Sequence, residues 1–221
     1  MQKKFNAINS FSSVNEHTET EWGSNATYIN DICYGNTYPN SYLDIYLSPV
    51  EGENKPTYFF IHGGGYVWGD KIGGDPNTRD SGLEWYINTF LENGINVVSP
   101  NYCFAPEYSY PTQVVQLNEC LDFLVQHGAE YGISMERVII GGGSAGGNLA
   151  GMLGLVCTNQ EIAAELGTEQ YMTKENVVAC VFVSALINNE DFSITHDAVL
   201  DWLFLQCGRS AFHCGFYKEM I

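Results

Sequence analysis

Two glycine-rich clusters contain the residues whose types and spacing could do chemistry. The first is HGGGY at 62–66, and the second is GGGSAGGN at 141–148. The second contains a G-x-S-x-G pattern around Ser144, in which a serine occupies a sharp strand-to-helix turn and its neighbours must lack side chains. Such a turn exposes the serine hydroxyl and directs the N–H of Ala145 towards an oxyanion forming on a bound substrate.

The first cluster could complete this oxyanion hole, because consecutive glycines let backbone N–H groups approach a substrate without Cβ atoms in the way. G-x-S-x-G alone is a weak signal. HGGG after one strand and GxSxGG after a later strand, in that order, is specific and predicts a hydrolase-type site. A dinucleotide-binding domain is the weaker alternative. The second cluster also spells G-x-G-x-x-G, but no acidic residue ends a strand about 20 positions further on.

Alternating strands and helices must position these clusters. Apolar or alternating runs predict strands over 26–33, 41–47, 57–61, 95–99, 137–140 and 177–185, with the first two as a hairpin and the last buried. Apolar stripes at helical spacing predict helices over 80–93, 112–127, 145–158 and 197–206. This order predicts an α/β fold with a mostly parallel sheet and helices on both faces. Residues 1–25 are polar and are expected to form a poorly ordered arm.

Composition limits the partners. The 221 residues include 9 Lys+Arg and 26 Asp+Glu, a net charge of −17, which argues against nucleic acid or an anionic membrane as a partner. Because 45% of residues are hydrophobic and only 16% charged, the chain is expected to be globular with an acidic surface. The longest apolar run, Val177–Ile187, is too short to span a bilayer.

The seven cysteines are an odd number without a C-x-x-C pair, so neither a zinc site nor a redox motif is predicted. The residues after Lys3 and Lys4 are too polar for the apolar part of a secretion signal. We therefore expect a reduced, cytoplasmic protein without a metal.

Three segments carry a resemblance to a known family. HGGGYVWGD (62–70), NYCFAPEYSYP (101–111) and GGGSAGGNLAG (141–151) resemble the hormone-sensitive-lipase-like and bacterial acetyl-esterase branch of the α/β-hydrolase fold, over roughly residues 28–205. The resemblance implies a carboxylesterase that uses no cofactor and cleaves small esters with short acyl chains. It implies Ser144 as the acylated nucleophile, the N–H groups of Gly64, Gly65 and Ala145 as the oxyanion hole, and His62 as a brace for the glycine loop.

The sequence departs from this family in two places. Gly143 stands where many members carry Asp. Members also supply an acid and then a histidine after the serine, whereas only His196 and His213 follow Ser144 here, and neither follows a predicted strand. We therefore expect residues 26–221 to be one truncated domain that lacks its last strands and has a cap-like part at 186–221.

Such a shortened chain is expected to be weak or inactive as an esterase. A catalytically dead small-molecule binding protein of the same fold is the alternative. A strand at 177–185 with a bare edge would also favour homo-oligomers.

Other side chains near the clusters have open interpretations. Tyr66 and Trp68 could line a substrate pocket or pack beneath the glycine loop. Asn148 could hydrogen-bond within the glycine loops or face solvent. Asp70 and Lys71 are expected to form a solvated pair in a loop.

Overall fold

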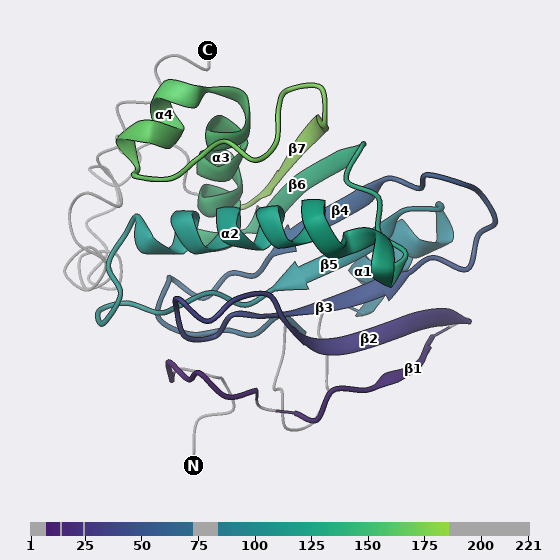
Figure 1. Cartoon of the computed structure of the whole chain (residues 1–221). Coiled ribbons are helices and arrows are strands. Elements are labelled where there is room, and N and C mark those ends of the chain that lie inside the picture. Colours follow the sequence, from purple (N-terminus) through teal and green to yellow (C-terminus); the bar gives the residue numbers. More distant parts are fainter. Residues whose placement is uncertain (1–7, 14, 24, 73–83, 186–221) are drawn as a thin grey trace.

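The computed structural model describes residues 8–13, 15–23, 25–72 and 84–185. Within them, seven strands form one sheet in the order β1-β2-β3-β5-β4-β6-β7 (Figure 1). The strands are β1 (Glu19–Trp22), β2 (Ala26–Cys33), β3 (Tyr42–Leu47), β4 (Thr57–Ile61), β5 (Asn96–Pro100), β6 (Val138–Gly143) and β7 (Val177–Val183).

The described helices are α1 (Glu84–Glu92), α2 (Thr112–His127), α3 (Ala145–Thr158) and α4 (Gln160–Glu165), with a 3-10 turn at Gly128–Tyr131. The helices predicted at 112–127 and 145–158 are confirmed to the residue. The helix predicted at 80–93 is present from Glu84 to Glu92, and residues 80–83 lie outside the described residues. The helix predicted at 197–206 and the cap-like part at 186–221 also lie outside them.

The sheet is mixed. The pairs β1–β2, β2–β3 and β3–β5 are antiparallel, and β5, β4, β6 and β7 are parallel to one another. The predicted hairpin of β2 and β3 is therefore confirmed. The parallel pairing of β4 with β6 places Ile61 opposite Gly142. Because parallel strands end at the same edge of a sheet, the two glycine clusters leave the sheet side by side.

Helices cover both faces of the sheet, as predicted, and β4 shows how. Phe59 and Ile61 point into a core shared with α2 and α3, which lie across one face (Figure 1). Tyr58 and Phe60 point the other way, into a second core that contains Ile87 of α1. A strand buried on both faces is continuously apolar, and each fully buried large side chain contributes about 2 kcal/mol.

Residues 19–22 do not belong to a poorly ordered arm, so that expectation is wrong for them. They form β1, an edge strand paired antiparallel with β2. Trp22 explains why this segment forms regular structure. Its ring lies 4.9 Å from the ring of Tyr46, and its Nε1–H donates to Asn88 on α1 at 2.9 Å. One partly buried aromatic side chain outweighs the three polar residues before it.

An asparagine also ties the N-terminal segment to the loop after β5. The Asn9 amide donates to the carbonyl of Phe104 at 3.0 Å and accepts the N–H of the same residue at 2.7 Å. This paired hydrogen bond imitates a rung of a β-ladder. Residues 1–7 lie outside the described residues.

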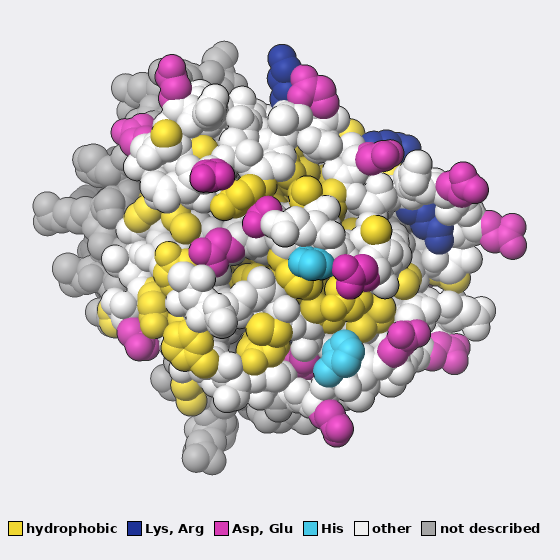
Figure 2. Space-filling model, in the orientation of Figure 1, with side chains coloured by type: hydrophobic (Ala, Val, Ile, Leu, Met, Phe, Trp, Pro, Cys, Tyr) yellow, Lys and Arg dark blue, Asp and Glu magenta, His cyan; other side chains and the backbone are white. Residues whose placement is uncertain are grey.

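The strand β7 is less buried than predicted. Val178 and Val183 are 52% and 45% exposed. Within the described part of the chain, β7 pairs with β6 alone. The visible face of the molecule carries acidic side chains over much of its extent (Figure 2), as the net charge of −17 predicts.

Candidate active site

Ser144 alone forms the turn between β6 and α3. Its backbone angles are φ 54° and ψ −122°, and its side chain is exposed. A positive φ at a residue with a Cβ costs about 1–3 kcal/mol and persists only where the surroundings impose it. Here the Ser144 N–H donates to the carbonyl of Val183 at 2.9 Å, and the Ser144 carbonyl accepts the N–H of Gly147 at 3.0 Å.

The glycines flanking Ser144 are required by close backbone contacts. A Cβ on Gly142 would lie 2.6 Å from the carbonyl carbon of Gly146, and a Cβ on Gly146 would overlap the carbonyl oxygen of Ile61. Gly143 differs, because a Cβ there would make an ordinary contact of 3.6 Å with the carbonyl of Val183. The turn therefore needs glycine at 142 and 146 and tolerates a side chain at 143.

The glycine loop after β4 lies against this turn, as the order of the two motifs predicts. A Cβ on Gly63 would be 3.4 Å from Ser144 Cβ and 2.9 Å from the carbonyl oxygen of Gly143. Gly64 has φ +116°, and its carbonyl accepts the N–H groups of Val67 at 3.1 Å and Trp68 at 3.2 Å. A Cβ on Gly64 would overlap the Trp68 carbonyl, so this reversal of the chain requires glycine.

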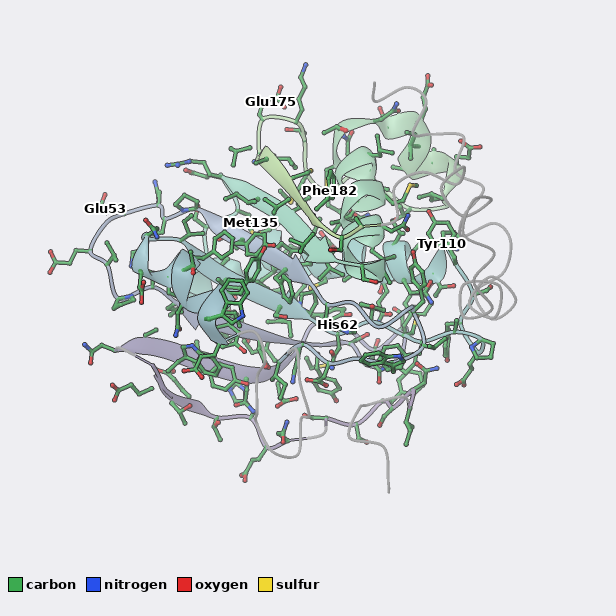
Figure 3. The ribbon with its side chains drawn as sticks, turned by 180° about the vertical axis from the view of Figure 1, so that it is seen from behind. Glu53, His62, Tyr110, Met135, Glu175 and Phe182 are labelled. Carbon is green, nitrogen blue, oxygen red and sulfur yellow. The ribbon has the colours of Figure 1, made fainter. Side chains whose placement is uncertain are left out.

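His62, the residue that follows β4, is buried within the molecule (Figure 3). Its ring stacks on Tyr102 at 4.3 Å, and its Nδ1 lies 2.7 Å from the carbonyl oxygen of Gly63, which can only accept a hydrogen bond. Nδ1 therefore carries the proton. Burial lowers the pKa of His62, which keeps the imidazole neutral. Gly69 packs onto this ring, because a Cβ there would overlap Nδ1.

Tyr66 packs beneath the loop. It is buried at φ 64°, and its hydroxyl donates to Asn148 Oδ1 of α3 at 2.8 Å. The interpretation that Asn148 hydrogen-bonds within the glycine loops is therefore confirmed, and the interpretation that it faces solvent is wrong. Trp68 is 41% exposed, so the two aromatic residues after HGGG have different surroundings.

The expected solvated pair of Asp70 and Lys71 is wrong. Lys71 is 1% exposed, and its Nζ lies 3.1 Å from an oxygen of Asp31 and 3.2 Å from an oxygen of Asp44. These carboxylates come from β2 and β3, so nothing next to Lys71 in the sequence announces them. The one available signal was Asp44 itself, an acidic residue inside the apolar strand LDIYL.

The loop after β5 also supports the glycine loop. Asn101 Oδ1 accepts the N–H of Lys71 at 2.6 Å, and Asn101 Nδ2 donates to Asp70 at 3.0 Å. The hydroxyl of Tyr102 donates to the carbonyl of His62 at 2.9 Å. The sequence identified this loop only as part of the resemblance.

Two further expectations concern features away from the serine. Among the described residues, no group of three His, Cys, Asp or Glu side chains could hold a metal ion. None of the described helices has the length and apolar composition needed to cross a bilayer. His196 and His213 lie outside the described residues, so the structure places neither of them relative to Ser144.

A mixed sheet with a serine on a sharp β6–α3 turn, facing a glycine loop after β4, defines an α/β-hydrolase fold. Residues 43–198 match the family model BD-FAE, and the chain belongs to this family. Solved structures share this fold. Esterase B from Lactobacillus rhamnosis superimposes with a TM-score of 0.68 at 20% identity, over 83% of this chain and 55% of that chain. A hyperthermophilic esterase from Pyrobaculum calidifontis superimposes with a TM-score of 0.59 at 23% identity, over 83% of this chain and 58% of that chain.

Sequence relatives carry names of the same kind. Arylacetamide deacetylase of Oryctolagus cuniculus is 38% identical over 118 residues, which cover 52% of this chain and 28% of that protein. Carboxylesterase NlhH of Mycobacterium tuberculosis is 31% identical over 109 residues, which cover 49% of this chain and 32% of that protein. The chain thus spans about a third of the length of these curated relatives.

Proposed function

We propose that this protein hydrolyses carboxylic esters with Ser144 as the nucleophile. The observation that carries the proposal is an exposed serine held at φ 54° against the glycine loop through Gly63. The relatives named esterase, lipase and carboxylesterase support the same reaction. Membership of a hydrolase family argues against the dinucleotide-binding alternative.

In the proposed reaction, Ser144 Oγ attacks the ester carbonyl carbon and the carbonyl oxygen becomes an oxyanion. The N–H groups of Gly64, Gly65 and Ala145 would stabilise this charge. Ala145 is the first residue of α3, where N–H groups have no acceptor within the helix and the helix dipole favours negative charge. Each such donor is worth about 100- to 1000-fold in rate. The C–O bond to the alcohol then breaks, and the proton lost from Ser144 Oγ ends on the leaving alcohol. Water then attacks the acyl-serine, which releases the acid and restores the serine hydroxyl.

A serine hydroxyl is a weak nucleophile until a base takes its proton. Among the described residues we assign no base, since His62 is committed to the Gly63 carbonyl and braces the loop instead. Loss of the base lowers turnover by about 10⁶-fold in the best-measured serine hydrolase. A catalytically dead binding protein of the same fold is therefore the competing proposal.

The substrate proposed is a small ester with a short acyl chain, cleaved without a cofactor. Trp68 is the better candidate to line the substrate pocket, because it is partly exposed whereas Tyr66 is buried.

A fluorophosphonate probe tests the nucleophile, because it forms a covalent bond only with an activated serine. We expect stoichiometric labelling at Ser144, mapped by mass spectrometry, and none in Ser144→Ala. A folded wild-type chain that takes up no probe at Ser144 would contradict the proposal and favour the binding protein.

We also propose a cytoplasmic location and a homo-oligomer formed through the β7 edge. Free thiols at all five described cysteines support the cytoplasmic location, since disulfides are rare in the cytosol.

The exposed valines of β7 support the homo-oligomer. Light scattering after size-exclusion chromatography tests the oligomer, and Val178→Lys should give a monomer. The charge of −17 argues against nucleic acid as a partner.

A further inference from the structure

A buried charge cluster lies at the end of the glycine loop, and the proposed reaction does not use it. It consists of Lys71 and three carboxylates, with Lys71 Nζ at 3.1 Å from Asp31, 3.2 Å from Asp44 and 4.0 Å from Asp70. All four side chains are at most 3% exposed. A buried cation persists only where paired and hydrogen-bonded, so the cluster is a built feature of the fold.

Each carboxylate is fixed by two hydrogen-bond donors. Asp44 accepts from the Tyr28 hydroxyl and the Asp31 N–H, both at 2.8 Å. Asp31 accepts hydrogen bonds from Ser13 Oγ and Asn30 Nδ2. Asp70 accepts hydrogen bonds from Asn101 Nδ2 and the Ile72 N–H. The ammonium of Lys71 is therefore held by carboxylates of β2 and β3 and by its neighbour Asp70, which Asn101 in the loop after β5 fixes in place.

The main chain of Lys71 is fixed as well. Its N–H donates to Asn101 at 2.6 Å, and its carbonyl accepts the Ser99 hydroxyl at 2.6 Å. The glycine loop thus starts at the end of β4 and ends at a residue anchored through side chain and backbone. Between these ends lie Gly64 and Gly65, whose N–H groups must face Ser144 in the proposed reaction.

Stability alone does not explain this arrangement. Apolar side chains of similar volume usually stabilise a protein interior as well as a buried ion pair does, or better. Here one cation faces three carboxylates, and burial raises the pKa of Asp44 to about 6 although Lys71 opposes the shift. Charged groups, unlike apolar ones, hold their hydrogen-bonding partners at a fixed distance and in a fixed direction.

We propose that Lys71 is a positioning residue, which ties the glycine loop to β2 and β3 and thereby fixes the Gly64 and Gly65 N–H groups opposite Ser144. The inference rests on the proposed ester hydrolysis for its consequence, but the anchoring itself can be measured without activity.

Hydrogen exchange followed by mass spectrometry tests the anchoring in the full chain. Lys71→Met removes the cation and keeps most of the volume. Lys55→Met is the control for loss of a lysine, since Lys55 Nζ contacts the backbone carbonyl of Ser48 before β4, whereas Lys71 Nζ contacts carboxylates. We expect exchange in a peptide covering 62–70 to rise at least tenfold in Lys71→Met, with α3 unchanged, and no change at 62–70 in Lys55→Met. Unchanged exchange at 62–70 in a folded Lys71→Met would overturn the proposal.

The double variant Lys71→Met/Asp44→Asn separates positioning from stability, and decides the question if the single variant does not fold. Because Asp44→Asn removes one unpaired carboxylate, the double variant should regain much of the urea unfolding midpoint that Lys71→Met loses. Hydrogen exchange of residues 62–70 should nevertheless stay fast. If loop protection returns together with the midpoint, the cluster is merely structural and the proposal fails.

The labelling rate at Ser144 connects the anchoring to chemistry. We expect fluorophosphonate labelling to slow about 10- to 100-fold in the double variant, on the scale of losing one oxyanion donor or less. A loosened loop with an unchanged labelling rate would overturn the positioning role. A wild-type protein that is never labelled refutes the proposed hydrolysis instead, and the exchange data still decide the anchoring.

Discussion

Gly63 lies directly against Ser144, with only 3.4 Å between the serine Cβ and the place that a Gly63 Cβ would occupy. The same atom would be 2.9 Å from the carbonyl oxygen of Gly143. The separation between the glycine loop and the serine is therefore set by main-chain contact. No side chain fits at position 63 without moving the loop away from the nucleophile.

Gly63→Ala should consequently slow probe labelling at Ser144 by about 10- to 100-fold, because the displaced loop donates less well to the oxyanion. Gly143→Ala is the matched control. Its Cβ meets the Val183 carbonyl at 3.6 Å, so its labelling rate should stay near that of wild type. Second-order labelling rates measure both, and equal rates in the two variants would contradict the expectation.

The backbone strain at Ser144 can be measured separately from its hydroxyl. Both Ser144→Ala and Ser144→Gly remove the nucleophile, but only glycine adopts φ 54° without a Cβ penalty. Ser144→Gly should therefore unfold in urea with a free energy about 1 kcal/mol higher than Ser144→Ala. An alanine variant as stable as the glycine variant would mean that the turn stores no strain.

The hydrogen bond between Tyr66 and Asn148 joins the glycine loop to α3 in a buried setting. Tyr66→Phe should cost about 1 kcal/mol of unfolding free energy, because the lost bond is shielded from water. Tyr42→Phe is the control, since the Tyr42 hydroxyl donates to the Phe11 carbonyl at an exposed site. Its cost should be near zero, and similar costs for the two variants would argue against a buried contribution.

Asp44 makes stability depend on pH in a definite direction. Burial raises its pKa from 3.8 to about 6, so the folded protein holds this proton more tightly than the unfolded chain does. The contribution of Asp44 is fully present below pH 4 and is lost as the pH rises through 6, by about 3 kcal/mol in all.

Three of the groups that face Asp44 keep their charge state over this range. The pKa of Lys71 and of the phenols of Tyr28 and Tyr46 is raised, so these three keep their protons. Asp31 and Asp70 complete the surroundings.

Urea unfolding of wild type and Asp44→Asn between about pH 4 and 7 isolates the Asp44 part, because an amide at position 44 does not titrate. The unfolding free energy of wild type should fall relative to that of the variant as the pH rises through this range. A difference between the two proteins that stays constant with pH would contradict the raised pKa of Asp44.

Local pattern was sufficient for the elements that carry the serine. Thr57–Ile61 is apolar throughout, and the small residues after Ser144 continue as an uninterrupted helix, so β4 and α3 were predictable. The order of HGGG and GxSxGG also predicted that the two clusters meet. Pattern failed where a partner lies far away in the sequence. Lys71 looks like a loop lysine until Asp31 and Asp44 are brought beside it by β2 and β3.

Because β6 pairs with β4, the glycine loop and Ser144 can meet only after β6 has been synthesised. β5 and α2 are translated between them, and pairing of segments so far apart pays the entropy of closing a long loop before any contact is gained. We expect the nascent chain to carry its glycine loop for some time without the serine that it will face. Pairing of β6 with β4 and assembly of the serine site are then one late folding event.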